Sequence, residues 1–417
     1  MQLQIHSETD RLEAVVVHTP GQEVSLVNPE IKEDLLFDDI IFEEDARAEH
    51  LDMLSIFRAA LPSGGQVYEI LDLAAESLQQ HNAKEWFVDG LISIVPEENL
   101  LPIREELGRS AEDELLRFVV QGKSPTGVHF TLPPVPNLLF TRDLGAVIGD
   151  RIILTRMAEP ARKREALIME LVVKFHPLFQ ELQPQVIQVP EGHSIEGGDI
   201  LMARPDTVLI GISQRTTFGG LMSVANQLLH GDVEHVIAVD IPKKRSSMHL
   251  DTIFTFADHT ECVVFDPVIN APTEQVVLLT RAGGEESTEN IDLEVMPSLK
   301  KALEELTEQS FTFIPCGGKD LTNQFREQWT DGANLFALAP GVVVGYERNT
   351  HTFREMEEYG YRRMNQFEFI EEFTQKPFDP VEQGKLTISF QGHELCRGRG
   401  GARCMTMPLR RNRSTHG

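Results

Sequence analysis

Residues 196–199 (EGGD) are one copy of a motif that recurs along this chain, each time close to a strand-like run. Related copies are residues 140–143 (FTRD) and 248–252 (MHLDT). Asp143 and Glu196 are 53 residues apart, and Glu196 and His249 are again 53 apart. A fixed period is typical of a repeated supersecondary unit. The spacing therefore predicts modules arranged around a shared axis.

The rest of the chain has the alternation of an α/β protein. Short apolar runs are bounded by Gly, Pro, Asp or Asn, and helical patterns separate several of them. The predicted strands are residues 12–17, 145–148, 152–154, 207–212, 235–239, 311–314 and 341–345. The clearest predicted helices are residues 162–176, 218–229 and 299–306.

Two segments depart from this alternation. Residues 45–122 are largely helical in character, and we predict a helical insertion over residues 70–125, between an α/β domain formed by residues 1–69 and 126–417. Residues 365–391 are aromatic and acidic and contain Pro377 and Pro380, so we predict a loop or hairpin there.

Composition excludes several classes of protein. The 417 residues are 41% hydrophobic, which is enough for a large core. The formal net charge of -27 disfavours nucleic acid and anionic membrane as partners and fits a cationic small molecule better. The four cysteines form no CxxC pair, no histidine cluster has metal-ligand spacing, and no leader or membrane span is visible. We expect a cytoplasmic protein without a metal.

Cys404 is the candidate nucleophile. It follows a run of glycines and arginines, residues 398–403 (GRGGAR), which suits the presentation of a thiol. Positive charge from Arg399 and Arg403 is expected to lower the pKa of the thiol. Most isolated cysteines are instead small buried apolar residues.

The acidic motifs indicate a type of reaction only when they are considered together. Singly, Asp143 could cap a turn, Glu196 could lie in a solvated turn, and His249 could be a core histidine. Jointly, Asp143 and Asp251 can hold a planar guanidinium by its edges in front of Cys404. His249 can then move protons, with Glu196 orienting its ring.

The chain resembles the arginine deiminases of the guanidine-modifying superfamily over about residues 12–408. The main matching segments are residues 136–143 (PNLLFTRD), 196–199 (EGGD), 211–216 (GISQRT), 248–252 (MHLDT) and 398–408 (GRGGARCMTMP). Further matches are residues 35–39 (LLFDD), 326–329 (REQW) and 331–334 (DGAN). The resemblance implies a pseudo-fivefold α/β propeller with an inserted helical domain.

The resemblance also implies roles. Cys404 would be the nucleophile, His249 the general acid and base, and Glu196 its partner, while Asp143 and Asp251 would clamp the guanidinium. Arg162 and Arg215 match positions that hold the substrate carboxylate, Arg399 matches a gating arginine, and Asn137 and Phe140 lie in the first motif and are expected at the substrate. Lys163 or Arg164 could replace Arg162 in its role.

The implied reaction converts L-arginine and water into L-citrulline and ammonia without a cofactor. The alternatives are an amidinotransferase, a hydrolase of another guanidine compound, and a regulatory protein that only binds arginine. The chain could also assemble as a homo-oligomer. Residues 361–395 are about twenty residues longer than the family pattern, so this segment could cover the pocket, mediate assembly or alter substrate size.

Overall fold

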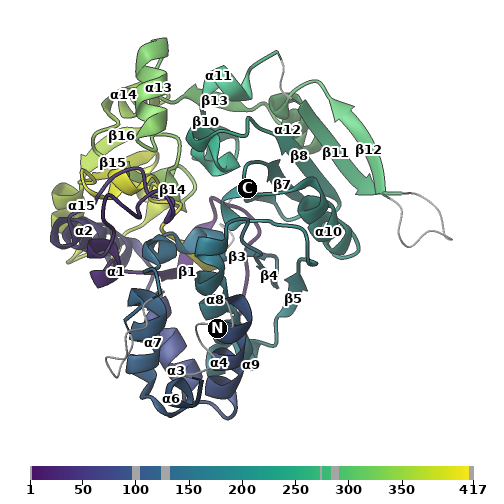
Figure 1. Cartoon of the computed structure of the whole chain (residues 1–417). Coiled ribbons are helices and arrows are strands. Elements are labelled where there is room, and N and C mark those ends of the chain that lie inside the picture. Colours follow the sequence, from purple (N-terminus) through teal and green to yellow (C-terminus); the bar gives the residue numbers. More distant parts are fainter. Residues whose placement is uncertain (1, 96–103, 124–131, 273–274, 283–290, 413–417) are drawn as a thin grey trace.

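The computed structural model describes residues 2–95, 104–123, 132–272, 275–282 and 291–412. Over these residues the chain is a mixed α/β protein whose strands form five sheets (Figure 1). None of the described helices is both long and apolar enough to cross a membrane. The predicted α/β class is confirmed.

Each sheet contains the same local arrangement, an antiparallel strand pair extended by a parallel strand. The parallel strand is reached by a crossover that contains a helix, as parallel pairing requires. The strands are β18 (Met407–Asn412), β1 (Arg11–Val17) and β2 (Gln66–Glu69); β3 (Gly145–Ile148), β4 (Arg151–Leu154) and β5 (Gln185–Gln188); β6 (Ile200–Arg204), β7 (Thr207–Ile212), β8 (His235–Asp240), β11 (Gln275–Arg281) and β12 (Ile291–Met296); β9 (Phe254–Phe256), β10 (Glu261–Val264) and β13 (Thr312–Pro315); and β14 (Phe336–Ala339), β15 (Val342–Tyr346), β17 (Leu386–Phe390) and β16 (Arg362–Asn365).

The helices of the crossovers agree with the predicted periodicity. The helix predicted over residues 162–176 is α8 (Lys163–Phe175), the one over 218–229 is α10 (Phe218–Leu229), and the one over 299–306 is α12 (Leu299–Thr307). All seven predicted strands are also present, each within one residue at either end. Local patterns were enough because the helices bury one apolar face, and strands such as β3, β7 and β15 are short, continuous apolar runs that are buried along nearly their whole length.

The segment predicted as a helical insertion contains α3 (Ile70–Leu78), α4 (Ala83–Ile94), α6 (Arg104–Arg109) and α7 (Glu112–Gln121). These helices gather at the lower end of the molecule in Figure 1, where α3 and α4 pack against α8. Part of the predicted insertion, residues 96–103 and 124–125, lies outside the described residues. The division into two domains stays a prediction.

The prediction of a loop or hairpin over residues 365–391 is wrong. The chain forms α15 (Gln366–Phe373), the short α16 (Pro380–Gln383) and then β17, which pairs in parallel with both β15 and β16. The prolines do not interrupt these elements, because Pro377 lies between the two helices and Pro380 occupies the first turn of α16. This segment therefore contributes a strand to a sheet and a helix, α15, that packs against β16 and β17 of the same sheet.

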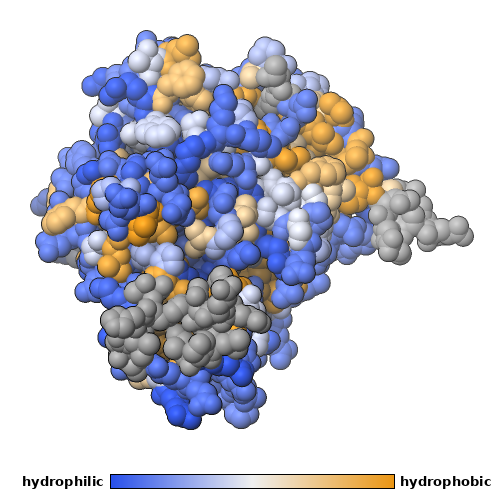
Figure 2. All heavy atoms as spheres, viewed as in Figure 1, coloured by the Kyte–Doolittle hydropathy of each residue, from blue (hydrophilic) through white to orange (hydrophobic). Residues whose placement is uncertain are grey.

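The surface agrees with the acidic composition. Figure 2 shows a face that is largely hydrophilic, with apolar side chains gathered over β11 and β12 at the right. Leu293 and Val295 of the edge strand β12 are 58% and 81% exposed.

Candidate active site

Four of the predicted site residues, Asp143, Glu196, His249 and Cys404, occupy equivalent positions in different sheets, each shortly before an edge strand of its sheet. Asp143 lies in a 3-10 turn before β3, Glu196 precedes the turn that leads into β6, and His249 precedes the turn that leads into β9. Cys404 is three residues before β18. Because each unit begins in the same way, residues far apart in the sequence meet at one place.

Glycines let these turns approach one another. A side chain at Gly197 would have its Cβ 2.0 Å from the carbonyl oxygen of Arg142, and one at Gly198 would have it 2.7 Å from the ring of His249. Such contacts are closer than any Cβ can make. The two glycines of the EGGD motif are thus required by close packing.

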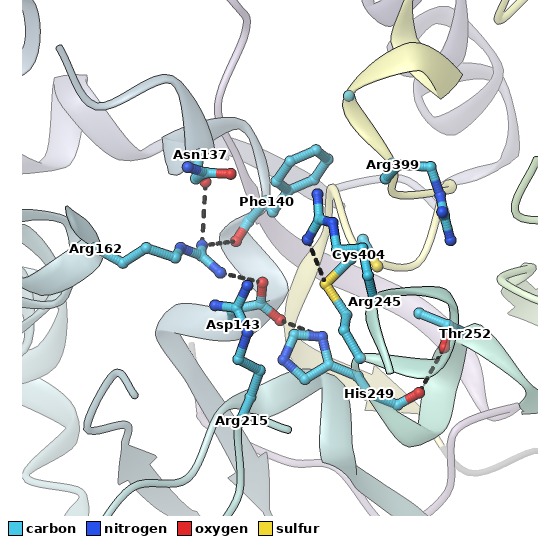
Figure 3. Close-up of a pocket in the computed structure, with 12 residues that line it drawn as sticks. Asn137, Phe140, Asp143, Arg162, Arg215, Arg245, His249, Thr252, Arg399 and Cys404 are labelled. Atoms are coloured by element: carbon cyan, nitrogen blue, oxygen red, sulfur yellow. Dashed lines mark hydrogen bonds and ion pairs between the residues drawn. The ribbon is translucent and has the colours of Figure 1, made fainter. Parts of the chain in front are cut away.

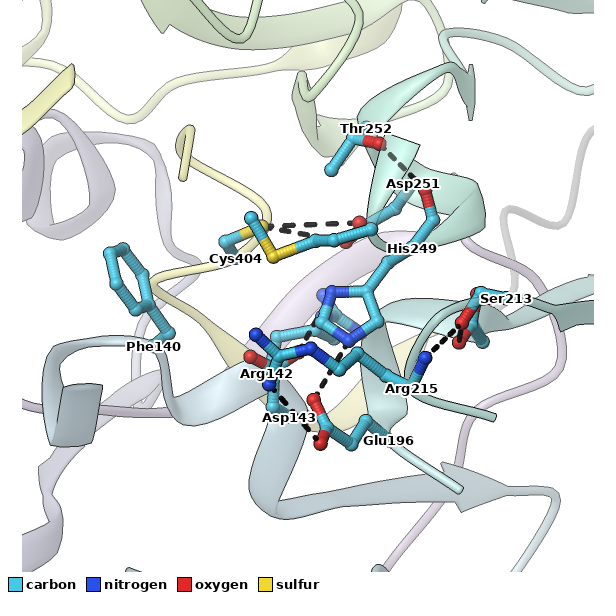
Figure 4. Close-up of polar contacts among 12 residues, drawn as sticks. Phe140, Arg142, Asp143, Glu196, Ser213, Arg215, His249, Asp251, Thr252 and Cys404 are labelled. Carbon is cyan, nitrogen blue, oxygen red and sulfur yellow. Dashed lines mark hydrogen bonds and ion pairs between the residues drawn. The ribbon is translucent and has the colours of Figure 1, made fainter. Parts of the chain in front are cut away.

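His249 and Glu196 form the central pair of the site (Figure 4). The Nε2 atom of His249 is 2.9 Å from Oε2 of Glu196, and its Nδ1 atom is 3.7 Å from Oδ1 of Asp143. Burial opposes a charge on the imidazole, but Asp143 and the hydrogen bond with Glu196 outweigh it and raise the pKa of His249 to about 9. Burial also opposes ionisation of Glu196, yet His249 and Arg215 lower its pKa to about 2. The pair is a buried imidazolium and carboxylate.

Cys404 is buried beside Asp251. Its Sγ atom is 3.7 Å from Oδ2 of Asp251, and its backbone N–H donates to Oδ1 of Asn334 at 2.9 Å. Burial, followed by the charges of Asp251 and Asp143, raises the pKa of the thiol well above its ordinary value. Arg403 lowers this pKa, as expected, but burial and the carboxylates outweigh it, so the net shift is opposite to the predicted one.

The charge of Arg403 is neutralised by two carboxylates. Its Nη1 donates to Oδ2 of Asp251 at 2.7 Å, while its Nε and Nη2 donate to the two oxygens of Glu8 at 3.1 and 3.0 Å. A fork of this kind fixes the guanidinium firmly. Arg403 therefore anchors Asp251. Glu8 was missed because it is 395 positions from Arg403 and belongs to no motif recognised in the sequence.

Arg162 lies among the acidic side chains. Its Nη1 donates to Asp143 at 2.6 Å, and its Nε donates to Glu165 at 2.8 Å. The two alternatives for its role are elsewhere, since Lys163 is exposed and Arg164 donates to the carbonyl of Val119 at 2.7 Å. Arg162, the predicted ligand of the substrate carboxylate, thus pairs with Asp143, the predicted ligand of the guanidinium.

Of the two residues predicted to bind the substrate carboxylate, Arg215 makes fewer side-chain hydrogen bonds than Arg162 among the described residues. It is buried, its Nη1 lies 3.7 Å from Oε1 of Glu196, and neither Nε nor Nη1 has a hydrogen-bond partner among the described residues. Buried donors without partners are costly. Arg215 therefore has donors available to an anionic group.

A cavity of about 20 Å³ brings most of these residues together (Figure 3). Its lining includes the predicted residues Asn137, Phe140, Asp143, Arg162, Arg215, His249, Arg399 and Cys404, and the unpredicted residues Arg245, Met248, Thr252 and Gly398. Glu196 and Asp251 lie behind this lining. Since one water needs about 10 to 15 Å³, the cavity has room for water but not for an amino acid.

Arg245 and Asn137 link the cavity to the LLFDD segment. The Nε of Arg245 donates to Asp38 at 3.0 Å, and the side chain of Asn137 donates to the carbonyl of Leu35 at 2.7 Å. The sequence match at residues 35–39 is explained by these contacts. Arg245 could have been suspected from its position three residues before Met248.

Asp143, Glu196 and His249 also bring three potential metal-ligand atoms within 4.8 Å of one another. In the described structure, Nη1 of Arg162 lies 2.6 Å from Asp143 and 3.6 Å from Glu196. These carboxylates thus already have a guanidinium as counter-ion.

Comparison with known proteins identifies the family. The sequence model of the family described as arginine deiminase matches residues 108–411. The chain belongs to the arginine deiminase family. This family member is 35% identical to the arginine deiminase of Listeria monocytogenes serovar 1/2a over 98% of this chain and 97% of that one. It is 33% identical to the arginine deiminase of Bacillus thuringiensis subsp. konkukian over 98% of each chain.

Solved structures share the fold of this family member at low identity. The product-bound N-terminal domain of ArgZ, an arginine dihydrolase of cyanobacteria, aligns with a TM-score of 0.54 at 14% identity, over 96% of this chain and 98% of that one. SxtG, an amidinotransferase from Microseira wollei, aligns with a TM-score of 0.55 at 13% identity, over 100% and 99%. The amidinotransferase fold is thus common to all three.

Proposed function

We propose that this protein is an arginine deiminase, which hydrolyses L-arginine to L-citrulline and ammonia. The observation that carries the proposal is the meeting of Cys404, His249 and Asp143 in one cavity, in a member of this family. A protein that only binds arginine has no use for a thiol beside a charged histidine.

A bound substrate would change the charges around Cys404 and so its ionisation. Burial, followed by the charges of Asp251 and Asp143, keeps Cys404 protonated, because a thiolate there would be desolvated and would face two carboxylates. A bound guanidinium between the same carboxylates would cancel their charge and favour the thiolate. We therefore propose that arginine itself promotes ionisation of Cys404, as its guanidinium replaces that of Arg162 at Asp143.

Two half-reactions follow. In the first, the Sγ of Cys404 forms a bond to the guanidinium carbon, and the bond to one terminal nitrogen breaks as His249 gives that nitrogen a proton, so that ammonia leaves. In the second, His249 takes a proton from water as the oxygen bonds to the same carbon. The carbon–sulfur bond then breaks and the second proton of that oxygen passes to solvent, which releases citrulline and the thiolate.

The remaining residues would position the substrate. Asp143 and Asp251 would hold the guanidinium, and Glu196 would stabilise the charged state of His249. We propose that Arg215 takes the substrate carboxylate, with Arg162 after it has left Asp143. Asn137 and Phe140 line the same cavity beside them, and Arg399 would act as the gate.

We also propose that the five sheets are arranged as a pseudo-fivefold propeller. The shared strand pattern supports this arrangement, and so does the placement of Asp143, Glu196, His249, Asn334 and Cys404, each shortly before the first strand of a unit. A central axis would explain why these five positions converge.

The test is to incubate the purified protein with L-arginine, without metal or amine acceptor, and to measure citrulline and ammonia beside a Cys404→Ala variant. The deiminase proposal expects equimolar products that disappear in the variant. A new guanidine compound formed only when an amine is supplied would instead indicate an amidinotransferase. Saturable arginine binding without turnover would refute the proposed hydrolysis.

A further inference from the structure

The matching segments within residues 326–334 have no role in the proposed reaction, but three of their residues contact the loop that carries Cys404. We name residues 398–404 the cysteine loop. Asn334 accepts a hydrogen bond from the backbone of Cys404 at 2.9 Å, and Asp331 accepts one from the backbone of Gly400 at 3.0 Å. The third contact is made by Trp329, the last residue of α13 (Leu321–Trp329), which stacks on Arg399.

The Arg399 guanidinium is stacked on the indole ring of Trp329. The central carbon of that guanidinium lies 3.6 Å from the centre of the indole ring. Arg399 is only 4% exposed, and none of its three guanidinium nitrogens has a hydrogen-bond partner among the described residues. A cation on an aromatic face is attracted by the ring quadrupole, and planar guanidinium groups stack well.

Arg399 in this position helps to close the site. It lines the cavity beside Cys404 and Phe140, and that cavity is too small for an amino acid. Its backbone has a φ of +63°, which a residue other than glycine adopts only when its surroundings hold it there. Gly398 and Gly400 flank Arg399, and glycine gives the backbone on both sides a wider choice of conformations than other residues allow. A substrate can enter only after this part of the loop has moved.

We propose that Trp329 is a positioning residue whose ring holds Arg399 in the closed position. The strength of this stacking then sets how often the cavity opens. Substrate must displace Arg399 from the ring, so the stacking energy reduces the apparent affinity for substrate. Trp329 is 44% exposed, which means that its replacement leaves the core intact. The part of this inference that concerns substrate rests on the proposed function, whereas the opening of the loop does not.

The first test measures opening without substrate. The rate at which iodoacetamide alkylates Cys404 is followed by peptide mass spectrometry in the wild type, in Trp329→Leu and in Leu321→Ala, all at one pH. Leu321 is the matched control, because it is an exposed apolar residue on the same helix. Trp329→Leu should react about threefold to tenfold faster, the factor that corresponds to a cation–π contact of this exposure. Trp329→Phe should be intermediate, since the smaller ring attracts a cation more weakly.

The second test distinguishes the proposed role of Trp329, which is to hold Arg399, from a merely structural role. In Trp329→Leu the KM for L-arginine should fall by a similar factor while kcat stays unchanged, whereas general destabilisation would lower kcat. Alkylation of Trp329→Leu at the wild-type rate, or an equal rise in Leu321→Ala, would overturn the inference. If the protein shows no turnover of arginine, the alkylation rates still decide the role of Trp329, so this inference and the proposed function can fail separately.

Discussion

Replacing Glu196 by glutamine tests the charge that holds His249 protonated. The substitution keeps the shape of the side chain and removes its negative charge, 2.9 Å from Nε2 of His249. The proposed mechanism needs a protonated His249 when ammonia leaves. The variant should therefore lose activity at alkaline pH, where the wild type still has its proton.

The size of the effect follows from the contact. A hydrogen bond between charged partners contributes about 1.5 to 3 kcal/mol, and one pKa unit corresponds to about 1.36 kcal/mol. Loss of the charge should thus lower the pKa of His249 by about one to two units, from about 9 in the wild type. The pKa of His249 should fall no further, because the carboxylate of Asp143 remains 3.7 Å from Nδ1 and still favours the charged ring.

The assay is the pH dependence of kcat/KM for citrulline formation, which reports ionisations of the free enzyme. The alkaline limb should fall near pH 9 in the wild type and about one to two units lower in Glu196→Gln. Glu191→Gln, at an exposed glutamate in the preceding loop, should match the wild type. An alkaline limb that stays in place in Glu196→Gln would refute the reasoning, because another group would then control the proton.

Two further substitutions test packing and buried charge. Gly198→Ala places a Cβ 2.7 Å from the imidazole of His249. It should lower kcat by at least about tenfold, roughly what a displacement of reacting groups costs. Gly108→Ala, whose added Cβ has nothing within 4 Å, should leave kcat unchanged, and kcat and circular dichroism of both variants check this. His18 lies 3.1 Å from both Glu23 and Glu69, which overcome burial and raise its pKa from 6.5 to about 9. Because the folded pKa is the higher one, this stabilisation is complete below pH 6.5 and is lost as the pH rises through 9. Denaturant unfolding should show His18→Gln less stable than the wild type by about 3 kcal/mol at pH 6 and nearly equal to it at pH 10; an equal difference at both values would contradict the prediction.

Most of the secondary structure could be predicted because its signals are local. A short continuous apolar run predicted β7, and helical periodicity predicted α10. The prediction failed over residues 365–391, where prolines and aromatic residues indicated a loop. In the fold the prolines lie outside the helical interiors, and Phe369, Phe373 and Phe378 pack against one another with ring centres 4.8 to 5.2 Å apart.

The composition of the candidate site could also be predicted, but not its electrostatic state. Asp143, His249 and Cys404 stand in short motifs whose residue types belong to one chemistry, and they do meet in one cavity. The anchoring of Arg403 by Glu8 had no sequence signal, because no rule of spacing connects the two ends of a chain.

The sequence by itself determined which groups are available, since the carboxylates, the imidazole, the thiol and the glycines of the turns are fixed by residue type. The spacing of 53 residues also indicated that Asp143, Glu196 and His249 recur in equivalent places. Only the tertiary structure decided their charges and contacts: that the pKa of Cys404 is raised rather than lowered, that Arg162 lies on Asp143, and that Arg399 rests on Trp329. The physical reason is that burial and Coulomb energy depend on distances through space, which the order of residues along the chain does not specify.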